Sequence, residues 1–282
     1  MKIRRSTRLV DMTYYLLENP RRLVSLTFFA ERYQSAKSSI SEDLVIIKQT
    51  FEQQGVGTLQ TIPGAAGGVK YIPYMNGMEA TELITELCKL LMTPDRLLPG
   101  GYLYMTDLLS NPRYINGAGR LFASLFSHKQ IDVVMTVATK GIPLAYAVAN
   151  YLNVPVVIAR KDSKVTEGPT VSINYVSGSS KRIQTMTLAK RSLAEGTNVL
   201  IVDDFMKAGG TIQGMISMLE EFKANVAGIG VLVEAENTEE RLIEDYVSLV
   251  RLSEVNVKDK CIEVEEGNYL LPALQHEGFA TE

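Results

Sequence analysis

The chain has 282 residues, of which 46% are hydrophobic and 22% charged, and its net charge is −3. This composition excludes a disordered or fibrous protein and suffices for roughly two globular domains. Two cysteines and two histidines are too few for a disulfide framework or a Cys/His zinc site, and the basic start precedes no apolar signal segment, so we expect a cytoplasmic protein without a membrane span.

The charge is unevenly distributed along the chain. Residues 1–74 carry ten Lys and Arg against six acids, a net charge of +4, and the remaining residues carry −7. A basic N-terminal segment followed by an acidic remainder suggests that the N-terminal segment binds a polyanion. An ordinary solvated surface accounts for the same charges, so this observation alone leaves both interpretations open.

The first 74 residues predict three helices and a β-hairpin. The first helix is expected to begin near Ser6 or Thr7 and to end at Asn19-Pro20, and a short second helix covers about residues 27–33. The third is the clearest, because apolar residues recur at helical spacing and Ser39-x-x-Glu42 fits a capping box. Its apolar stripe consists of Ile40, Leu44, Ile47 and Phe51. Two short strands, at about 58–62 and 69–72, then flank a glycine-rich turn.

Three helices followed by a hairpin is the pattern of the winged helix, a DNA-binding domain whose third helix enters the major groove. The polar side of that helix and the basic arm before the first helix would then face phosphates and base edges. The predicted DNA-binding residues are Lys2, Arg4, Arg5, Arg8, Lys37, Ser38, Ser39 and Ser41. The alternatives are a small helical subdomain without a nucleic-acid role and a protein-interaction or dimerisation module.

The remainder of the chain, residues 75–282, predicts a second domain of the α/β class. Near-continuous apolar runs alternate with helical segments, which is typical of a parallel sheet covered on both faces. The runs lie at about 131–138, 154–159, 199–203 and 226–233, and the intervening helices at 142–152 and 211–223.

The segment most indicative of chemistry is Val-Leu-Ile-Val-Asp-Asp-Phe-Met-Lys-Ala-Gly-Gly-Thr, residues 199–211. A buried strand ends in Asp203 and Asp204, and a glycine-bearing loop then opens a helix. The amides of residues 208–211 and the helix N-terminus form a cradle for a phosphate, and carboxylates at this edge of the sheet accept hydrogen bonds from ribose hydroxyls. The alternative, an ordinary strand-end pair in a helix-capping loop, does not explain the glycines.

This segment resembles the phosphoribosyl pyrophosphate (PRPP) motif of type I phosphoribosyltransferases. The resemblance implies that the two aspartates hold the ribose 2- and 3-hydroxyls, that residues 208–211 hold the 5-phosphate and that residues 139–141 meet the pyrophosphate. It also implies a flexible hairpin over the site, built from residues 171–175 and 181–187. The predicted PRPP-binding residues are Tyr102, Thr139, Lys140, Gly141, Arg160, Asp203, Asp204, Phe205, Lys207, Ala208, Gly209, Gly210 and Thr211. Mg²⁺ is expected to arrive on the pyrophosphate and to have no resident protein site.

One position departs from the transferases. At Lys207 the 6-oxopurine enzymes place an aspartate and the adenine and orotate enzymes a small residue. A lysine there favours retention of a polyanionic ligand and does not help a nucleobase to protonate or align. We therefore predict that the domain binds PRPP without catalysis; an active purine phosphoribosyltransferase with an accessory N-terminal domain is the alternative.

Residues 1–270 as a whole, including Ser-Ser-Ile-Ser-Glu-Asp-Leu and Pro-Gly-Gly-Tyr102, resemble the purine-operon repressors of Gram-positive bacteria. The resemblance implies a homodimeric repressor of purine synthesis and transport genes that binds operator DNA and is released by PRPP. It also places Tyr102 near the effector, although a core tyrosine is an equal interpretation. The phosphate cradle suggests guanosine tetraphosphate as a further ligand.

Overall fold

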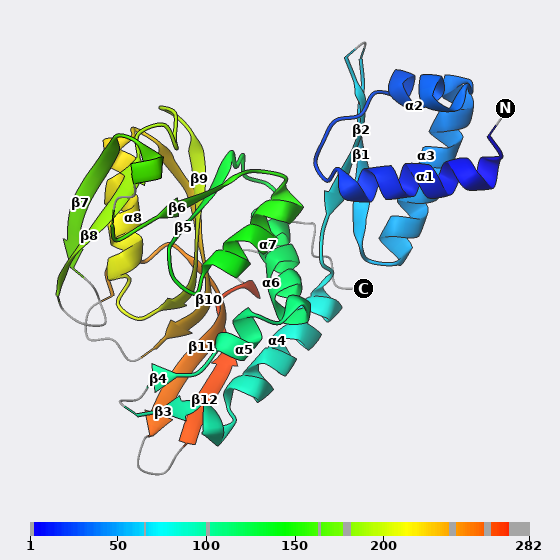
Figure 1. Ribbon diagram of the computed structural model, residues 1–282. Coiled ribbons are helices and arrows are strands. Elements are labelled where there is room, and N and C mark those ends of the chain that lie inside the picture. The colour runs from blue at the N-terminus through cyan, green and yellow to red at the C-terminus, as the bar shows by residue number, and fades with distance from the viewer. Residues whose placement is uncertain are drawn as a thin grey trace. The chain divides into compact units, whose positions relative to one another are not determined.

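The computed structural model describes residues 3–64, 66–99, 102–162, 165–176, 182–236, 241–256 and 261–270. The chain divides into two compact units (Figure 1). One comprises Met1–Asn76 together with Asn150–Asn153, and the other comprises Gly77–Ala149 and Val154–Glu282. No helix among the described residues is long and apolar enough to cross a membrane.

The first unit is a winged helix, as predicted. Its elements are α1 (Arg5–Glu18), α2 (Leu26–Tyr33), α3 (Lys37–Gln53), β1 (Gly57–Ile62) and β2 (Gly68–Pro73). Strands β1 and β2 pair antiparallel, and Val24, ahead of α2, adds a bridge to Val69 of β2. The predicted apolar stripe of α3 is confirmed, since Ile40, Leu44, Ile47 and Phe51 are all buried.

The starts of α1 and α3 differ from the sequence-based expectation. Helix α3 begins at Lys37 after Ala36, which makes no side-chain cap, so the proposed capping box at Ser39 is wrong. Helix α1 begins at Arg5, ahead of the proposed caps. The buried face of α1 consists of Arg8, Met12 and Leu16, while the apolar side chains of Val10 and Leu17 are exposed.

The second unit contains a six-stranded sheet in the order β12-β11-β10-β9-β5-β6. The five strands β5, β6, β9, β10 and β11 are parallel, and β12 runs antiparallel at the edge beside β11. The strands are β5 (Val133–Val137), β6 (Val156–Ala159), β9 (Asn198–Met206), β10 (Asn225–Ala235), β11 (Val247–Asn256) and β12 (Cys261–Glu266). The prediction of a parallel α/β sheet is confirmed, and β11 is a strand that was not predicted from the sequence.

Helices cover both faces of this sheet (Figure 1). On one face, glycines in β10 admit aromatic rings from α6: a Cβ at Gly230 would lie 2.8 Å from Phe122. On the other, α8 contributes Ile212, Met215 and Met218 to the core. The helical elements of the unit are α4 (Gly77–Leu91), η1 (Pro94–Arg96), α5 (Thr106–Leu109), α6 (Pro112–Leu125), α7 (Ile142–Leu152), η2 (Val165–Glu167) and α8 (Gly210–Glu221).

Two antiparallel hairpins complete the unit. Strands β3 (Leu97–Leu98) and β4 (Tyr102–Leu103) form a short one, and β7 (Thr170–Val176) and β8 (Ile183–Ala189) form a longer one. The longer hairpin packs on α8 through Tyr175, whose ring would lie 2.8 Å from a Cβ at Gly214. A hairpin of these residues was expected from the sequence, and residues 177–181 between its strands lie outside the described residues.

Candidate functional site

The direction in which the chain adds strands to the sheet reverses between β5 and β9. From β5 the chain proceeds through α7 to β6 on one side, and from β9 it proceeds through α8 to β10 on the other. Strands β5 and β9 pair only as far as Met135 and Ile201, so beyond these residues the two strand ends are not paired with each other. Crevices at such reversals, at the carboxyl ends of parallel strands, are the usual ligand sites of open α/β sheets.

The loop between β9 and α8 has the geometry of a phosphate cradle. Gly209 has φ of +87°, a left-handed conformation that side chains rarely adopt, and it directly precedes α8. The first intrahelical bond is donated by Gln213 N–H to Gly209 C=O, 2.8 Å. Because a helix has no intrahelical partners for its first amides, the N-terminus of α8 presents donors and positive dipole charge to an anion.

Asp203 and Asp204 precede this loop in the sequence and are buried within β9, which continues to Met206. The amide of Asp204 donates to Asp203 Oδ1, 3.0 Å. Burial, reinforced by the neighbouring charge of Asp204, raises the pKa of the Asp203 carboxyl well above its ordinary value. Burial also raises the pKa of Asp204, while its neighbours, including the cation of Lys140, act to lower it. Both carboxyls are buried, so hydroxyl donors from a ligand would stabilise their ionised forms.

The second loop of the crevice, between β5 and α7, comes close to the aspartates. A Cβ at Gly141 would lie 3.0 Å from Thr136 Oγ1 and 3.1 Å from Asp203 Oδ1, so only glycine fits there without displacement. The Thr136 hydroxyl is buried and has no hydrogen-bond partner among the residues that the structure describes. Thr139 and Lys140 are exposed. The structure therefore places the predicted pyrophosphate loop beside the predicted ribose-binding pair.

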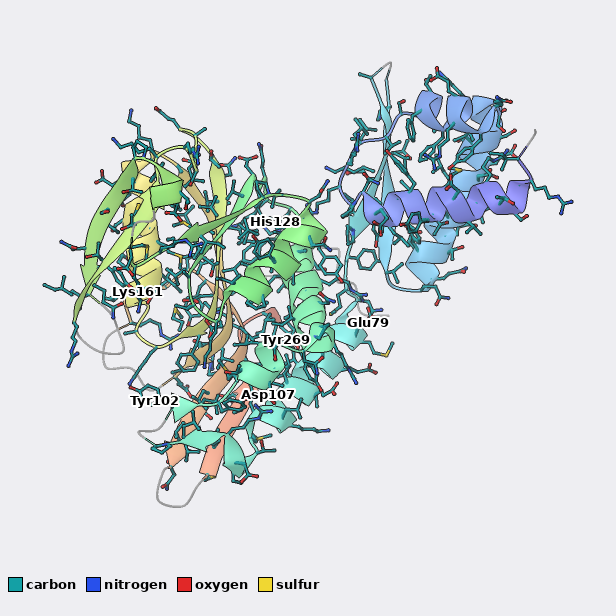
Figure 2. The ribbon with its side chains drawn as sticks, in the orientation of Figure 1. Glu79, Tyr102, Asp107, His128, Lys161 and Tyr269 are labelled. Atoms are coloured by element: carbon teal, nitrogen blue, oxygen red, sulfur yellow. The ribbon has the colours of Figure 1, made fainter. Side chains whose placement is uncertain are left out.

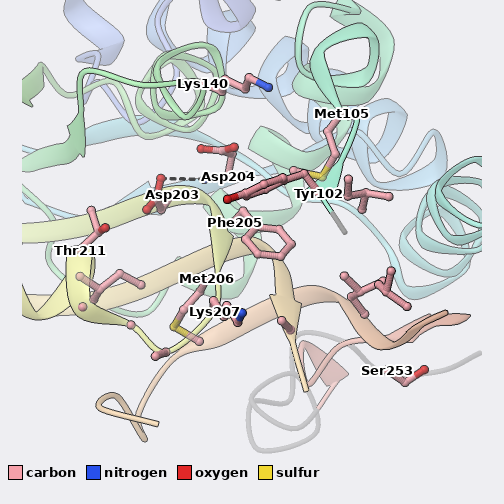
Figure 3. Close-up of a pocket in the computed structure, with 18 of the residues that line it drawn as sticks. Tyr102, Met105, Lys140, Asp203, Asp204, Phe205, Met206, Lys207, Thr211 and Ser253 are labelled. Atoms are coloured by element: carbon pink, nitrogen blue, oxygen red, sulfur yellow. Dashed lines mark hydrogen bonds between the residues drawn. The ribbon is translucent and has the colours of Figure 1, made fainter. Parts of the chain in front are cut away.

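These elements line a pocket of about 830 Å³ (Figure 3). Its walls include most of the predicted residues: Tyr102, Lys140, Asp203, Asp204, Phe205, Lys207, Ala208, Gly209, Gly210 and Thr211. Figure 3 shows the two aspartates between Lys140 and the side of the pocket that carries Phe205 and Lys207. Two-thirds of Tyr102 is exposed, which makes it a rim residue and excludes the alternative of a core tyrosine.

The pocket extends beyond the predicted set toward β11. Its additional lining residues are Leu103, Met105, Met206, Ile212, Ala235, Leu252, Ser253, Glu254 and Val255. The group at 252–255 lies at the carboxyl end of β11, which is parallel to β10. The signal that would have revealed it is the apolar run before that group, read as one more parallel strand.

Arg160 is not among the residues that line the pocket. Its Nε lies 2.8 Å from Glu167 Oε1, and its backbone is bridged to Thr187 of β8. The cation is therefore already neutralised by an acid of its own segment. Figure 2 marks its neighbour Lys161, which is exposed past the end of β6. Among the described residues no group of three or more His, Cys, Asp or Glu side chains is placed to hold a metal ion.

In the winged-helix unit, Lys37, Ser38 and Ser41 are exposed at the start of α3, and Ser39 is half-buried. Arg4 is exposed immediately before α1, and Lys2 lies outside the described residues. The polar residues expected to face DNA thus occupy the leading turns of α3, opposite its buried stripe.

Two arginines of α1 have a different environment from the one expected. Arg8 is buried and its Nε lies 2.5 Å from Asp43 Oδ2, while its Nη1 donates to Ser35 Oγ, 2.8 Å. Arg5, which is exposed, also donates to Asp43, 2.8 Å. The prediction that Arg8 contacts DNA is wrong, because that side chain holds α1 against α3.

The fold and the pocket define a chain in which a winged helix is joined to a phosphoribosyltransferase-type domain. Residues 4–73 match the family model described as "Bacterial purine repressor, N-terminal", and residues 105–265 match the "Phosphoribosyl transferase domain". The chain is 69% identical over 96% of its length to the "Purine biosynthesis transcriptional repressor PurR" of Bacillus subtilis, covering 95% of that protein. The chain belongs to this family of purine biosynthesis transcriptional regulators.

Other relatives match the whole chain or its second unit. The "Purine biosynthesis transcriptional activator PurR" of Lactococcus lactis is 48% identical over 94% of this chain and 98% of its own length. A "Xanthine phosphoribosyltransferase" of Clostridium tetani is 36% identical over 43% of this chain and 65% of its own length. Among solved structures, an adenine phosphoribosyltransferase from Thermoanaerobacter pseudethanolicus superposes with a TM-score of 0.51 at 25% identity, over 59% of this chain and 98% of that chain.

Proposed function

We propose that this protein represses purine biosynthesis and transport genes by binding operator DNA through its winged helix, and that PRPP bound in the pocket of the second unit relieves this repression. The main support for this proposal is the pocket between the ends of β5 and β9, where a phosphate cradle and two buried carboxyls lie on adjacent elements. The name of the B. subtilis relative supports the regulatory half of the proposal.

The pocket suits PRPP in three respects. The Gly209–α8 cradle would hold the 5-phosphate, Asp203 and Asp204 would accept hydrogen bonds from the ribose hydroxyls, and residues 139–141 would meet the pyrophosphate. Mg²⁺ would be bound by pyrophosphate oxygens and water and would neutralise part of the ligand's charge. Other phosphorylated nucleotides such as guanosine tetraphosphate, whose phosphates fit the same cradle, would compete with PRPP.

Relief of repression requires that PRPP binds more tightly to a form of the protein with weak DNA affinity, because a ligand shifts an equilibrium only by its differential affinity. We further propose that the protein acts as a homodimer, since two-fold symmetric regulators read two half-sites of an operator. The direct test is fluorescence anisotropy of a labelled duplex from upstream of a purine gene, titrated with protein with and without PRPP and Mg²⁺. PRPP should weaken binding at least tenfold; equal affinities with and without PRPP would contradict the proposal.

A second role in transcription is favoured by the L. lactis relative that is named an activator. Transcription in vitro from the same duplex separates the roles. A repressor lowers transcript yield when added without PRPP, whereas an activator raises it.

We propose that the second unit has no transferase activity, although its relatives include xanthine phosphoribosyltransferases. This proposal rests on Lys207, an exposed cation in the loop that lines the pocket. The purine transferases have an acid or a small residue at this position. Assays of pyrophosphate release with PRPP, Mg²⁺ and each purine base decide the matter. Turnover in the ordinary enzyme range of roughly 1–10³ s⁻¹ would establish the transferase alternative.

A further inference from the structure

The outer side of the phosphate loop is supported by a segment between β10 and β11. The amide of Leu242 donates to the Ala208 carbonyl, 2.9 Å. Ile243, which is 5% exposed, would lie 2.7 Å from a Cβ at Gly209. The loop is thus hydrogen-bonded to one residue of this segment and packed against the next.

The hydrogen bond from Leu242 has a consequence for the cradle. In a planar trans peptide the C=O and the following N–H point in opposite directions. The bond fixes the Ala208 carbonyl toward Leu242, so the N–H of Gly209 points away from the supporting segment. The orientation of this one peptide therefore decides whether the loop offers an amide donor or a carbonyl oxygen to a phosphate.

The supporting segment, residues 241–246, is itself held by one buried carboxylate. Glu234 of β10 is 1% exposed and pairs in the sheet with Met206, the last residue of β9 before the loop. Arg241 and Tyr246, at the two ends of the segment, both donate to Glu234 Oε2. Arg241 also donates to the carbonyl of Ala235, 2.6 Å.

The other oxygen of Glu234 is tied to the sheet. Ser248 Oγ donates to Oε1 at 2.7 Å and Arg251 Nε donates at 3.2 Å. The guanidinium of Arg241 additionally lies 5.4 Å from the centroid of the Tyr246 ring. One oxygen of Glu234 thus holds both ends of the supporting segment while the other anchors the carboxylate to β11. Glu234 does not line the pocket, so it acts on a ligand only through the loop.

We propose that Glu234 is a positioning residue for the phosphate site: it holds residues 241–246 in the place from which Leu242 and Ile243 orient the Ala208–Gly209 peptide. This inference rests on the proposed PRPP site and names the residue that sets its phosphate affinity. No backbone hydrogen bond joins residues 138–141, between β5 and α7, to the supporting segment. Loss of Glu234 should therefore affect the 5-phosphate and leave the pyrophosphate end unaffected.

The experiment compares Glu234→Gln with Glu265→Gln in the full chain. Glu265 is an exposed acid whose carboxylate lies 3.8 Å from the same Arg251, and no hydrogen bond or ion pair joins it to residues 241–246. Calorimetry with ribose 5-phosphate probes the cradle, and calorimetry with magnesium pyrophosphate probes the other loop. We expect Glu234→Gln to weaken ribose 5-phosphate binding about tenfold, the effect of losing hydrogen bonds to a charged group, with pyrophosphate affinity unchanged. Glu265→Gln should change neither.

A readout without ligand separates this inference from the proposed function. Hydrogen exchange of the Leu242 amide reports its bond to Ala208 directly and should accelerate at least tenfold in Glu234→Gln but not in Glu265→Gln. Tyr246→Phe, which removes one donor and keeps the ring, should act in the same direction with a smaller effect if the glutamine variant does not fold. Unchanged exchange at Leu242, or an equal loss for both probes, overturns the positioning role. If the unmodified protein binds neither probe, the PRPP proposal fails while exchange still decides this one.

Discussion

Arg8 Nε and Asp43 Oδ2 lie 2.5 Å apart in the interior of the winged helix and join α1 to α3. Asp43 is fully buried and Arg8 nearly so. Removing one partner of a buried pair leaves an uncompensated charge, at a cost of about 3–5 kcal/mol. Arg8→Met should therefore destabilise the first unit by this amount, measured by native-state hydrogen exchange of the α1 and α3 amides.

The matched control is Arg32→Met, which removes an exposed ion pair with Asp11 in the same unit. Exposed pairs contribute about 0–1 kcal/mol, so this variant should exchange almost like the unmodified protein. Equal effects of the two substitutions would show that the buried pair has no special role.

Asp203→Asn should stabilise the ligand-free protein. Burial and the charge of Asp204 raise the pKa of Asp203 in the folded state, so its favourable contribution is present at acidic pH and is lost as pH rises through the raised pKa. At neutral pH the ionised carboxylate is a cost that asparagine removes. We expect a gain of about 1 kcal/mol or more, roughly 2–4 °C in Tm, near pH 7.5.

The same comparison near pH 4 should show a smaller difference, because the carboxyl of the folded protein is then protonated. Asp162→Asn, at an exposed position past β6, serves as the control and should be neutral. A lower Tm for Asp203→Asn at pH 7.5 would mean that the carboxylate is already well stabilised without a ligand, against the interpretation of the site given above.

Gly141→Ala should disturb the loop between β5 and α7. The added methyl would meet Thr136 Oγ1 at 3.0 Å and Asp203 Oδ1 at 3.1 Å, both in the interior. Overpacking of this kind costs about 1–3 kcal/mol, which we expect to appear as roughly a 5- to 150-fold loss of PRPP affinity. Gly77→Ala, whose methyl has nothing within 4 Å, is the control and should leave PRPP affinity unchanged.

Lys37→Ala should weaken operator binding through loss of one phosphate contact. Lys37 is exposed at the first residue of α3. Loss of one phosphate contact lowers the slope of log K against log salt by about 0.9, without altering which sequence is preferred. Lys89→Ala, an exposed lysine of α4 in the other unit, should leave the slope unchanged. An unchanged slope for Lys37→Ala would remove this residue from the DNA interface.

The fold was largely predictable because its signals are local and periodic. The stripe from Ile40 to Phe51 identifies α3, and the apolar runs before Ala138 and Asp203 identify the central parallel strands. The glycine loop after β9 predicted the phosphate cradle, since a left-handed residue at Gly209 is a local requirement.

The errors concern contacts between residues distant in sequence. Nothing near Arg8 indicates that its charge is matched by Asp43, 35 positions later. Likewise, the bridge of Arg160 to Thr187 and the place of residues 252–255 in the pocket depend on how strands and loops meet in space. The capping box at Ser39 failed because α3 begins one turn earlier than the apolar pattern alone suggests.

Titration calorimetry of the full chain with PRPP in magnesium buffer tests the central claim most directly, namely that the loop after β9 and the adjacent aspartates bind a phosphorylated ribose. We expect saturable heat with one site per chain for the unmodified protein and at least a tenfold loss of affinity for Asp204→Ala. Saturable binding that is unaffected by Asp204→Ala, or no heat together with no change in Tm, would contradict the assignment of this pocket to PRPP.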